Sequence, residues 1–156
     1  MRDYKKEYEE RVAFIRDLLE KSGAKGIVYG NSGGKDSALV GILCKAACDN
    51  TVGIIMPCAS KRNFGQDAED ARIAADQYGI ETRFIDLTPV REAEMQQLSS
   101  LTEVTPAAAV NIAPRLRMTT LYAVAASEGR LVAGTGNRSE AYVGQFTKWG
   151  AGAHDF

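Results

Sequence analysis

The sequence predicts an α/β fold in which an open, mostly parallel sheet lies between helices on both faces, giving three layers. Four short apolar runs alternate along the chain with segments of helical periodicity, the pattern of a parallel sheet with crossover helices. The first and fourth runs end in Gly-rich polar loops, "NSGGKDS" and "GTGNRSE". Ligands of such sheets bind beyond the carboxyl ends of the strands, where the strand order reverses. A strand order of 3-2-1-4 would therefore bring both loops to one crevice.

The first half of the chain is predicted to contain two helices and two strands. An amphipathic helix runs from Tyr4 to Lys21 and ends near Gly23, and a strand covers Gly26 to Gly30. A helix from Asp36 to Ala47 and a strand from Thr51 to Pro57 follow. The side chains expected to face inward are Tyr8, Val12, Ile15, Leu18 and Leu19 in the first helix, and Leu39, Val40, Leu43 and Ala46 in the second.

The second half continues the alternation after one ambiguous stretch. A helix is predicted from Asp67 to Tyr78 and a strand from Thr82 to Leu87. The residues from there through Pro106 show no clear period. Pro114 to Gly129 reads as a helix with proline in its first turn, and "RLVAGTG" reads as the fourth strand running into its loop.

Composition is that of one soluble globular domain, expected over residues 1–156. The chain is 45% hydrophobic and 25% charged, with a formal net charge of −1. We expect no nucleic-acid partner, because the basic surface of such proteins is missing. No apolar run approaches the roughly 18 residues of a membrane span, and no signal peptide is recognisable. Three cysteines without a secretory signal indicate a cytoplasmic setting, with Cys44 and Cys48 filling core space rather than binding zinc.

The loop after the first strand has residue types that bind phosphate. It is not a Walker A loop, because Asp36 stands where Ser or Thr is required, and it is not a G-x-G-x-x-G fingerprint. Gly33 and Gly34 let the backbone approach an anion, and the helix N-terminus supplies N–H donors. The hydroxyls of Ser32 and Ser37 add two more donors. A carboxylate beside phosphates requires a cation between them, so Asp36 predicts Mg²⁺; the alternative is that it only caps the helix.

These motifs resemble those of a known family. "SGGKDS" resembles the S-G-G-x-D-S signature of the PP-loop ATP pyrophosphatases, which cleave ATP between its α- and β-phosphates. "NIAPRLRMTTLYAVA" and "GTGNRSEAYVGQFTKWGAGAHD" are similar to the ammonia-dependent NAD synthetases of that superfamily, over Asn111 to Asp155. The resemblance implies an adenine nucleotide alpha-hydrolase-like fold and a homodimeric, cytoplasmic ligase. Such an enzyme uses Mg²⁺, ATP and ammonia to convert deamido-NAD⁺ through an NAD-adenylate into NAD⁺, AMP and pyrophosphate.

The same resemblance implies roles for individual residues. Lys35 stands at the variable position of the signature and is given no catalytic role. Asp36 and Glu140 would bind Mg²⁺, and Asp36, Lys148 and Asp155 would be catalytic. Arg115, Lys148 and Asp155 would contact deamido-NAD⁺. The residues implied to bind ATP are Gly30, Asn31, Ser32, Gly33, Gly34, Lys35, Asp36, Ser37 and Thr135.

Several alternatives remain open at this stage. Glu140 could only cap the following helix, Arg115 could be a solvated charge, and Thr135 could only satisfy a turn. Trp149 is expected to pack rather than to serve as a stacking platform. The single histidine, His154, is left without a role. The functional alternatives are a GMP synthetase-like adenylating enzyme and a non-catalytic nucleotide-binding fragment.

The chain also departs from the family pattern. Ala151 stands where the family has an acidic residue, and Asn31 replaces a small apolar residue. The family continues beyond Phe156, so a C-terminally truncated chain is expected. No room precedes the first strand for a glutamine-hydrolysing domain, which favours free ammonia as the nitrogen donor. The loop after Pro57 is expected to form a flap that brings Lys61 or Arg62 near the phosphates.

Overall fold

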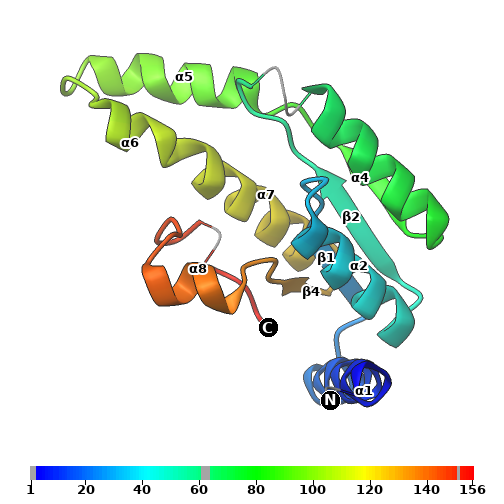
Figure 1. Ribbon diagram of the computed structural model, residues 1–156. Coiled ribbons are helices and arrows are strands. Elements are labelled where there is room, and N and C mark those ends of the chain that lie inside the picture. The colour runs from blue at the N-terminus through cyan, green and yellow to red at the C-terminus, as the bar shows by residue number, and fades with distance from the viewer. Residues whose placement is uncertain (1–2, 61–63, 151) are drawn as a thin grey trace.

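A parallel sheet forms the centre of the molecule (Figure 1). The structure, a computed structural model, describes residues 3–60, 64–150 and 152–156. Within these residues the sheet has four strands in the order β3-β2-β1-β4, with β1 parallel to both β2 and β4, and β2 parallel to β3. The strands are β1 (Gly26–Gly30), β2 (Thr51–Ile55), β3 (Glu81–Phe84) and β4 (Arg130–Ala133). The predicted fold class and strand order are confirmed.

Helices cover both faces of this sheet, as predicted. On one face α2 packs against β1 and β2, α4 packs against β2 and β3, and α1 packs on α2. On the other face α7 packs against β1 and β4 and carries α5 and α6. None of the described helices is long and apolar enough to cross a membrane. The helices are α1 (Tyr4–Ser22), α2 (Lys35–Ala47), α4 (Gln66–Gln77), α5 (Thr88–Ser99), α6 (Pro106–Val110), α7 (Ile112–Glu128) and α8 (Arg138–Val143).

Strand β1 is apolar along its length because it contributes to two cores. Ile27 and Tyr29 point into the core under α1, α2 and α4, whereas Val28 points into the core under α7. Side chains of a strand alternate between faces, so a strand covered on both sides reads as a continuous apolar run. The "GIVYG" run therefore marks a central strand, which is its observed position.

The largest difference from the predicted elements lies in the ambiguous stretch before Pro106. It forms helix α5, which has proline in its first turn, and the short α6 begins at Pro106 itself. None of the α5 side chains is buried. A helix without a buried apolar stripe gives no clear period, so its sequence did not reveal it. The second and third strands also end earlier than predicted, at Ile55 and Phe84.

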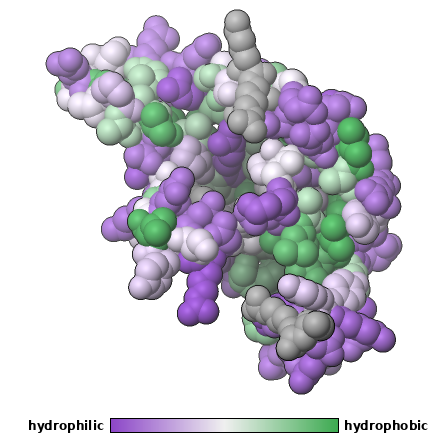
Figure 2. Space-filling view, in the orientation of Figure 1, coloured by the Kyte–Doolittle hydropathy of each residue, from purple (hydrophilic) through white to green (hydrophobic). Residues whose placement is uncertain are grey.

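Two side chains predicted to face inward do not. Leu39 is 56% exposed and Tyr8 is 44% exposed. Helix α2 instead buries Ser37, Gly41 and Cys44, which lie on the opposite side of the helix from Leu39. The close approach of α2 to the sheet explains this choice, since a Cβ on Gly41 would lie 2.3 Å from the Tyr29 hydroxyl oxygen. Figure 2 shows the resulting apolar surface around α2 and α4 among mostly hydrophilic side chains.

The cysteines fill space in the core, as predicted. Cys44 and Cys58 are buried, Cys48 is half-buried, and all three are free thiols. Burial, followed by the proximity of Cys48, raises the pKa of the Cys44 thiol to about 12. Cys44 is therefore a neutral, unreactive side chain at physiological pH.

An ion-pair cluster joins α7 to both edges of the sheet. The Glu128 carboxylate, at the end of α7, accepts hydrogen bonds from Arg83 on β3 and from Nε of Arg130 on β4, the latter at 2.6 Å. Arg130 is only 7% exposed, and its Nη1 also donates to the carbonyl of Asn50 at 3.0 Å. The hydrogen bonds from Arg83 and then Arg130 lower the pKa of Glu128 below its ordinary value.

Glu128→Gln is expected to destabilise the fold by about 1 kcal/mol at pH 7, as for a partly exposed ion pair. A carboxylate with a lowered folded pKa stabilises the fold above its unfolded pKa, roughly 4.3, and loses that contribution as pH falls through the folded value. The difference in unfolding free energy between the unsubstituted chain and the variant should therefore disappear as pH falls below about 4. Urea unfolding of both proteins at pH values from 7 to 3 measures this difference.

Glu81→Gln is the matched control. Glu81 forms an ion pair with Arg83, and its side chain is 55% exposed. Replacement of Glu81 should lower the free energy of unfolding at pH 7 by less than replacement of Glu128. If the difference in unfolding free energy between the unsubstituted chain and Glu128→Gln stayed constant with pH, the charge of the Glu128 carboxylate would not be what stabilises the fold.

Candidate functional site

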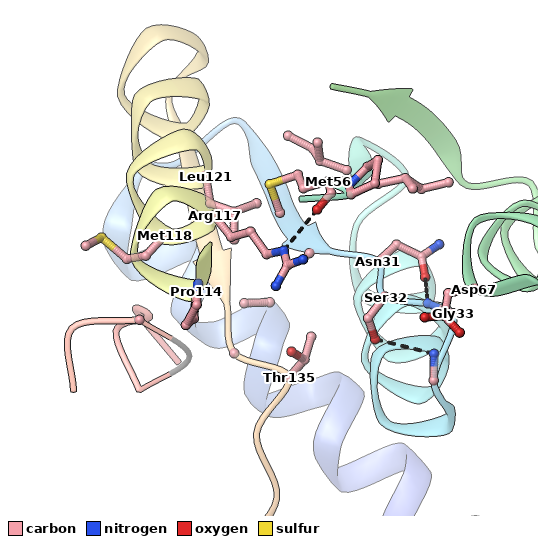
Figure 3. A pocket seen from close by; sticks show the side chains of 18 of the residues that line it. Asn31, Ser32, Gly33, Met56, Asp67, Pro114, Arg117, Met118, Leu121 and Thr135 are labelled. Carbon is pink, nitrogen blue, oxygen red and sulfur yellow. Dashed lines mark hydrogen bonds between the residues drawn. The ribbon is translucent and has the colours of Figure 1, made fainter. Parts of the chain in front are cut away.

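A pocket opens at the carboxyl ends of β1, β2 and β4 (Figure 3). Its volume of about 490 Å³ is in the range of sites for small-molecule ligands. Residues 30–34 after β1 form one wall, residues 54–57 at the end of β2 a second, and residues 132–135 after β4 a third. Helices α4 and α7, together with Gly150 and Ala153 of the C-terminal segment, complete the lining. The two Gly-rich loops, after β1 and β4, thus meet at one cavity, as the predicted strand order required.

The loop between β1 and α2 is held in shape by its own hydroxyl groups. Ser37 Oγ donates to the carbonyl of Gly34 at 2.9 Å and accepts from the backbone N–H of Ser32 at 3.3 Å. Ser32 Oγ accepts from the N–H of Gly34 at 3.3 Å. Gly34 is the N-cap of α2 and carries no side-chain cap. The internal hydrogen bonds fix the loop so that the positive end of the 13-residue helix α2 stands at the rim of the pocket, which suits an anion.

The wall of the pocket formed by the end of β2 and by α7 is mostly apolar and carries a half-buried cation. Met56, Met118 and Leu121 are among its apolar residues, and Arg117 extends from α7 toward Met56 (Figure 3). Arg117 Nε donates to the carbonyl of Met56 at 2.9 Å. Burial lowers the pKa of Arg117 from its ordinary value. A flat apolar wall beside hydrogen-bonding backbone suits an aromatic base.

Arg117 was not among the site residues predicted from the sequence. Arg115 and Arg117 are two residues apart on α7, so they point to nearly opposite sides of the helix and only one can face the pocket. The structure places Arg117 in the lining and leaves Arg115 exposed. The helical spacing of Pro114, Arg117, Met118 and Leu121 is the signal that would have identified it.

The two carboxylates predicted to bind Mg²⁺ are linked through Asn137. Asp36 Oδ2 accepts from Asn137 Nδ2 at 3.3 Å. Glu140 Oε2 accepts from the N–H of Asn137 at 3.1 Å, and the N–H of Glu140 donates to Asn137 Oδ1 at 2.9 Å, which makes a capping box at the start of α8. The capping role considered for Glu140 is thus present. The oxygen donors of Asp36 and Glu140 fit the preference of Mg²⁺ for carboxylates at a phosphate site.

The residues implied to contact deamido-NAD⁺ lie outside the pocket lining. Arg115 Nε donates to the backbone carbonyl of Lys148 at 3.2 Å, which brings these two together. Asp155 is separate from them: its Oδ1 accepts from the Tyr122 hydroxyl at 3.0 Å and its Oδ2 from the N–H of Val132 at 2.8 Å. Asp155 therefore holds the C-terminal segment against β4 in this structure.

The remaining predicted residues are placed as follows. Gly30, Asn31 and Thr135 line the pocket together with the three loop residues Ser32, Gly33 and Gly34. Lys35, Asp36 and Ser37 do not line it, and neither does Glu140. The Lys35 ammonium is exposed and lies 3.5 Å from Asp36 Oδ2. The prediction that Trp149 packs is wrong, because it is 67% exposed, at a φ of 60°. Predictions for Lys61, Arg62 and Ala151 fall outside the described residues.

Comparison with known proteins places the chain among the NAD synthetases. The family described as NAD synthase matches residues 7–156. The NH₃-dependent NAD⁺ synthetase of Carboxydothermus hydrogenoformans is 42% identical over 98% of the chain, which spans 63% of that protein. The NH₃-dependent NAD⁺ synthetase of Pyrobaculum aerophilum is 38% identical over 99% of the chain, which spans 58% of it. The chain thus covers less than two thirds of the length of these relatives.

Solved structures give the same result. The NMN synthetase of Francisella tularensis superposes with a TM-score of 0.91 at 34% identity, over 99% of this chain and 63% of that one. The NH₃-dependent NAD synthetase of Campylobacter jejuni superposes with a TM-score of 0.89 at 34% identity, over 100% of this chain and 66% of that one. The glutamine-dependent NAD⁺ synthetase of Acinetobacter baumannii, solved with ADP, superposes with a TM-score of 0.90 at 29% identity, over 97% of this chain and 29% of that one.

Proposed function

The chain belongs to the NAD synthase family, and on that premise we propose that it acts in the ATP-dependent amidation of deamido-NAD⁺ by ammonia. The products are NAD⁺, AMP and pyrophosphate, formed through an NAD-adenylate. The observation that carries the proposal is the meeting of the "NSGGKDS" and "GTGNRSE" loops at one pocket. Ammonia is proposed as the nitrogen donor because the relatives that match most of this chain are NH₃-dependent.

The geometry supports a division of labour within the pocket. The apolar wall around Met56 and Leu121 would receive the adenine ring of ATP. The loop residues from Gly30 to Ser37, with Thr135 opposite, would hold the phosphates at the N-terminus of α2. Positioning of this kind and stabilisation of the charge on the departing pyrophosphate would supply most of the catalysis.

We propose that Asp36 and Glu140 hold Mg²⁺. Both carboxylates hydrogen-bond to Asn137, which brings the start of α2 and the start of α8 together. The ion would neutralise charge on the ATP phosphates. Arg115, Lys148 and Asp155 are proposed to contact deamido-NAD⁺, and the first two form one surface through the Lys148 carbonyl.

The remaining proposals concern the organisation of the protein. Residues 1–156 are proposed to form one ATP-pyrophosphatase domain. A homodimer is proposed as the assembled form. The apolar stripe of α1 is used within the chain, because Val12 and Ile15 are buried against the α2 side of the sheet. The α7 stripe likewise packs on the sheet.

A turnover assay on the 156-residue chain tests the proposed activity. With Mg²⁺, ATP, deamido-NAD⁺ and ammonium, AMP and NAD⁺ are expected to form in equal amounts, because each adenylated substrate consumes one ATP. AMP formation without NAD⁺ would contradict amidation. Absence of both products from folded protein would favour the non-catalytic nucleotide-binding alternative.

A second candidate substrate comes from the likeness to the Francisella NMN synthetase. The assay is therefore repeated with nicotinate mononucleotide in place of deamido-NAD⁺. Faster turnover of the mononucleotide would replace NAD⁺ synthesis with NMN synthesis as the proposed function.

A further inference from the structure

We propose that Asn31 is a positioning residue of the phosphate loop, which it ties to helix α4. The inference deepens the proposed function and rests on it. Asn31 follows β1 directly and is only 3% exposed, so its amide is a buried polar group with specific partners. Its role is to hold Gly33 in the backbone conformation that receives phosphate.

Both ends of the Asn31 amide are engaged. Nδ2 donates to the carbonyl of Ala71, in α4, at 2.9 Å. Oδ1 accepts from the N–H of Gly33 at 3.4 Å (Figure 3). A carbonyl can only accept and an N–H can only donate, so both contacts require the same orientation of the amide. One side chain thereby connects the loop to a helix 40 residues away in sequence.

Backbone packing of Gly33 against α4 depends on the same arrangement. Gly33 has a φ of 80°, and a Cβ at this position would lie 2.2 Å from the carbonyl oxygen of Asp67 in the first turn of α4. The loop therefore touches α4 at two points, the Gly33 backbone and the Asn31 side chain. Asp67 and Asp70 of α4 line the same pocket as the loop.

Asparagine is suited to this position for a specific reason. Its short side chain can bond to the backbone two residues on, which is the geometry of an Asx turn, while its N–H₂ group remains available for a second partner. Serine could reproduce only the local turn. An apolar residue would leave the Ala71 carbonyl and the Gly33 N–H without these bonds.

Calorimetric titration of the 156-residue chain with Mg-pyrophosphate and, separately, with adenosine tests the proposal. For Asn31→Ala the Kd for pyrophosphate is expected to rise about tenfold, the equivalent of about 1.4 kcal/mol, with the Kd for adenosine unchanged. The Kd for adenosine should not change, because the substitution leaves the apolar wall proposed to receive adenine unaltered. Asn31→Ser is expected to behave like Asn31→Ala, because it cannot reach Ala71.

The matched control is Asn50→Ala. Asn50 Nδ2 also donates to a backbone carbonyl, that of Lys25 at 2.7 Å, but lies before β2, at the opposite end of the strands from the pocket. This variant should bind both ligands like the unsubstituted chain. An equal loss of pyrophosphate and adenosine binding in Asn31→Ala would overturn the proposal, because it would indicate general damage. Unchanged pyrophosphate binding in Asn31→Ser would overturn the role of the contact with α4.

Hydrogen exchange in the unsubstituted chain provides a test that does not depend on a folded variant. The Nδ2 protons of Asn31 should exchange much more slowly than those of the exposed Asn50, because the former are buried and bonded to Ala71. Equal exchange rates would overturn the proposal. If the unsubstituted chain bound adenosine but not pyrophosphate, the proposed function itself would fail, and the role of Asn31 with it.

Discussion

Replacement of Asp36 by asparagine is expected to lower the rate of AMP formation by roughly a hundredfold or more, because a metal ion at transferring phosphates supplies several kcal/mol of charge stabilisation. Asparagine keeps the size of the side chain and an oxygen that can accept from Asn137 Nδ2. The change therefore removes the charge with little change in packing. Initial rates of AMP release at a series of Mg²⁺ concentrations measure the effect.

The Mg²⁺ dependence separates a metal-binding role from a structural one. If Asp36 binds the ion, half-saturation by Mg²⁺ should move to higher concentration in the variant, with unchanged thermal stability. Asp49→Asn is the matched control, since Asp49 lies just beyond the other end of α2 and pairs with Lys45 on the surface. Its rate should equal that of the unsubstituted chain. A fully active Asp36→Asn would show that the carboxylate is only part of the helix terminus.

Gly33→Ala is expected to weaken ATP binding and to destabilise the fold together. At a φ of 80° any L-residue is strained, at a cost of roughly 1–2 kcal/mol, and the new Cβ would also meet the Asp67 carbonyl. That oxygen belongs to the backbone of α4 and cannot rotate away, so the loop must move from the helix. We expect the KM for ATP to rise at least about tenfold, a loss of about 1.4 kcal/mol of binding.

Gly79→Ala provides the control for backbone strain alone. Gly79 has a similar φ of 64°, but no atom lies within 4 Å of the position its Cβ would occupy. Urea unfolding should show a smaller loss of stability for Gly79→Ala than for Gly33→Ala, and the KM for ATP should not change. Equal effects of the two substitutions on stability and KM would mean that contact with α4 does not shape the phosphate loop.

Strand positions were predictable from local patterns, and the strand order was predictable because two Gly-rich loops are expected to meet where the strand order reverses. The central β1 is marked by a five-residue apolar run between a helix end and a Gly-rich loop, and the structure places it where that pattern indicates. Helix α5 was not predictable, since it buries no side chain. Leu39 was predicted to face inward but is exposed, because α2 turns Gly41 toward the sheet instead. That choice depends on the buried Tyr29, which leaves no room for a Cβ at position 41.

For the site, the sequence by itself indicated a candidate phosphate-binding loop, the carboxylates of Asp36 and Glu140 as candidate metal ligands, and the family. Each of these features is encoded in a short contiguous string of residues. The types of residue in such a string, and their spacing, are those that binding one ligand requires. Tertiary structure alone decided that Arg117 and not Arg115 faces the pocket, that Asn137 links the two carboxylates, and that Asn31 ties the loop to α4. These contacts join residues that are distant in sequence, and their partners are set by how helices pack on the sheet, which no local pattern of residues specifies.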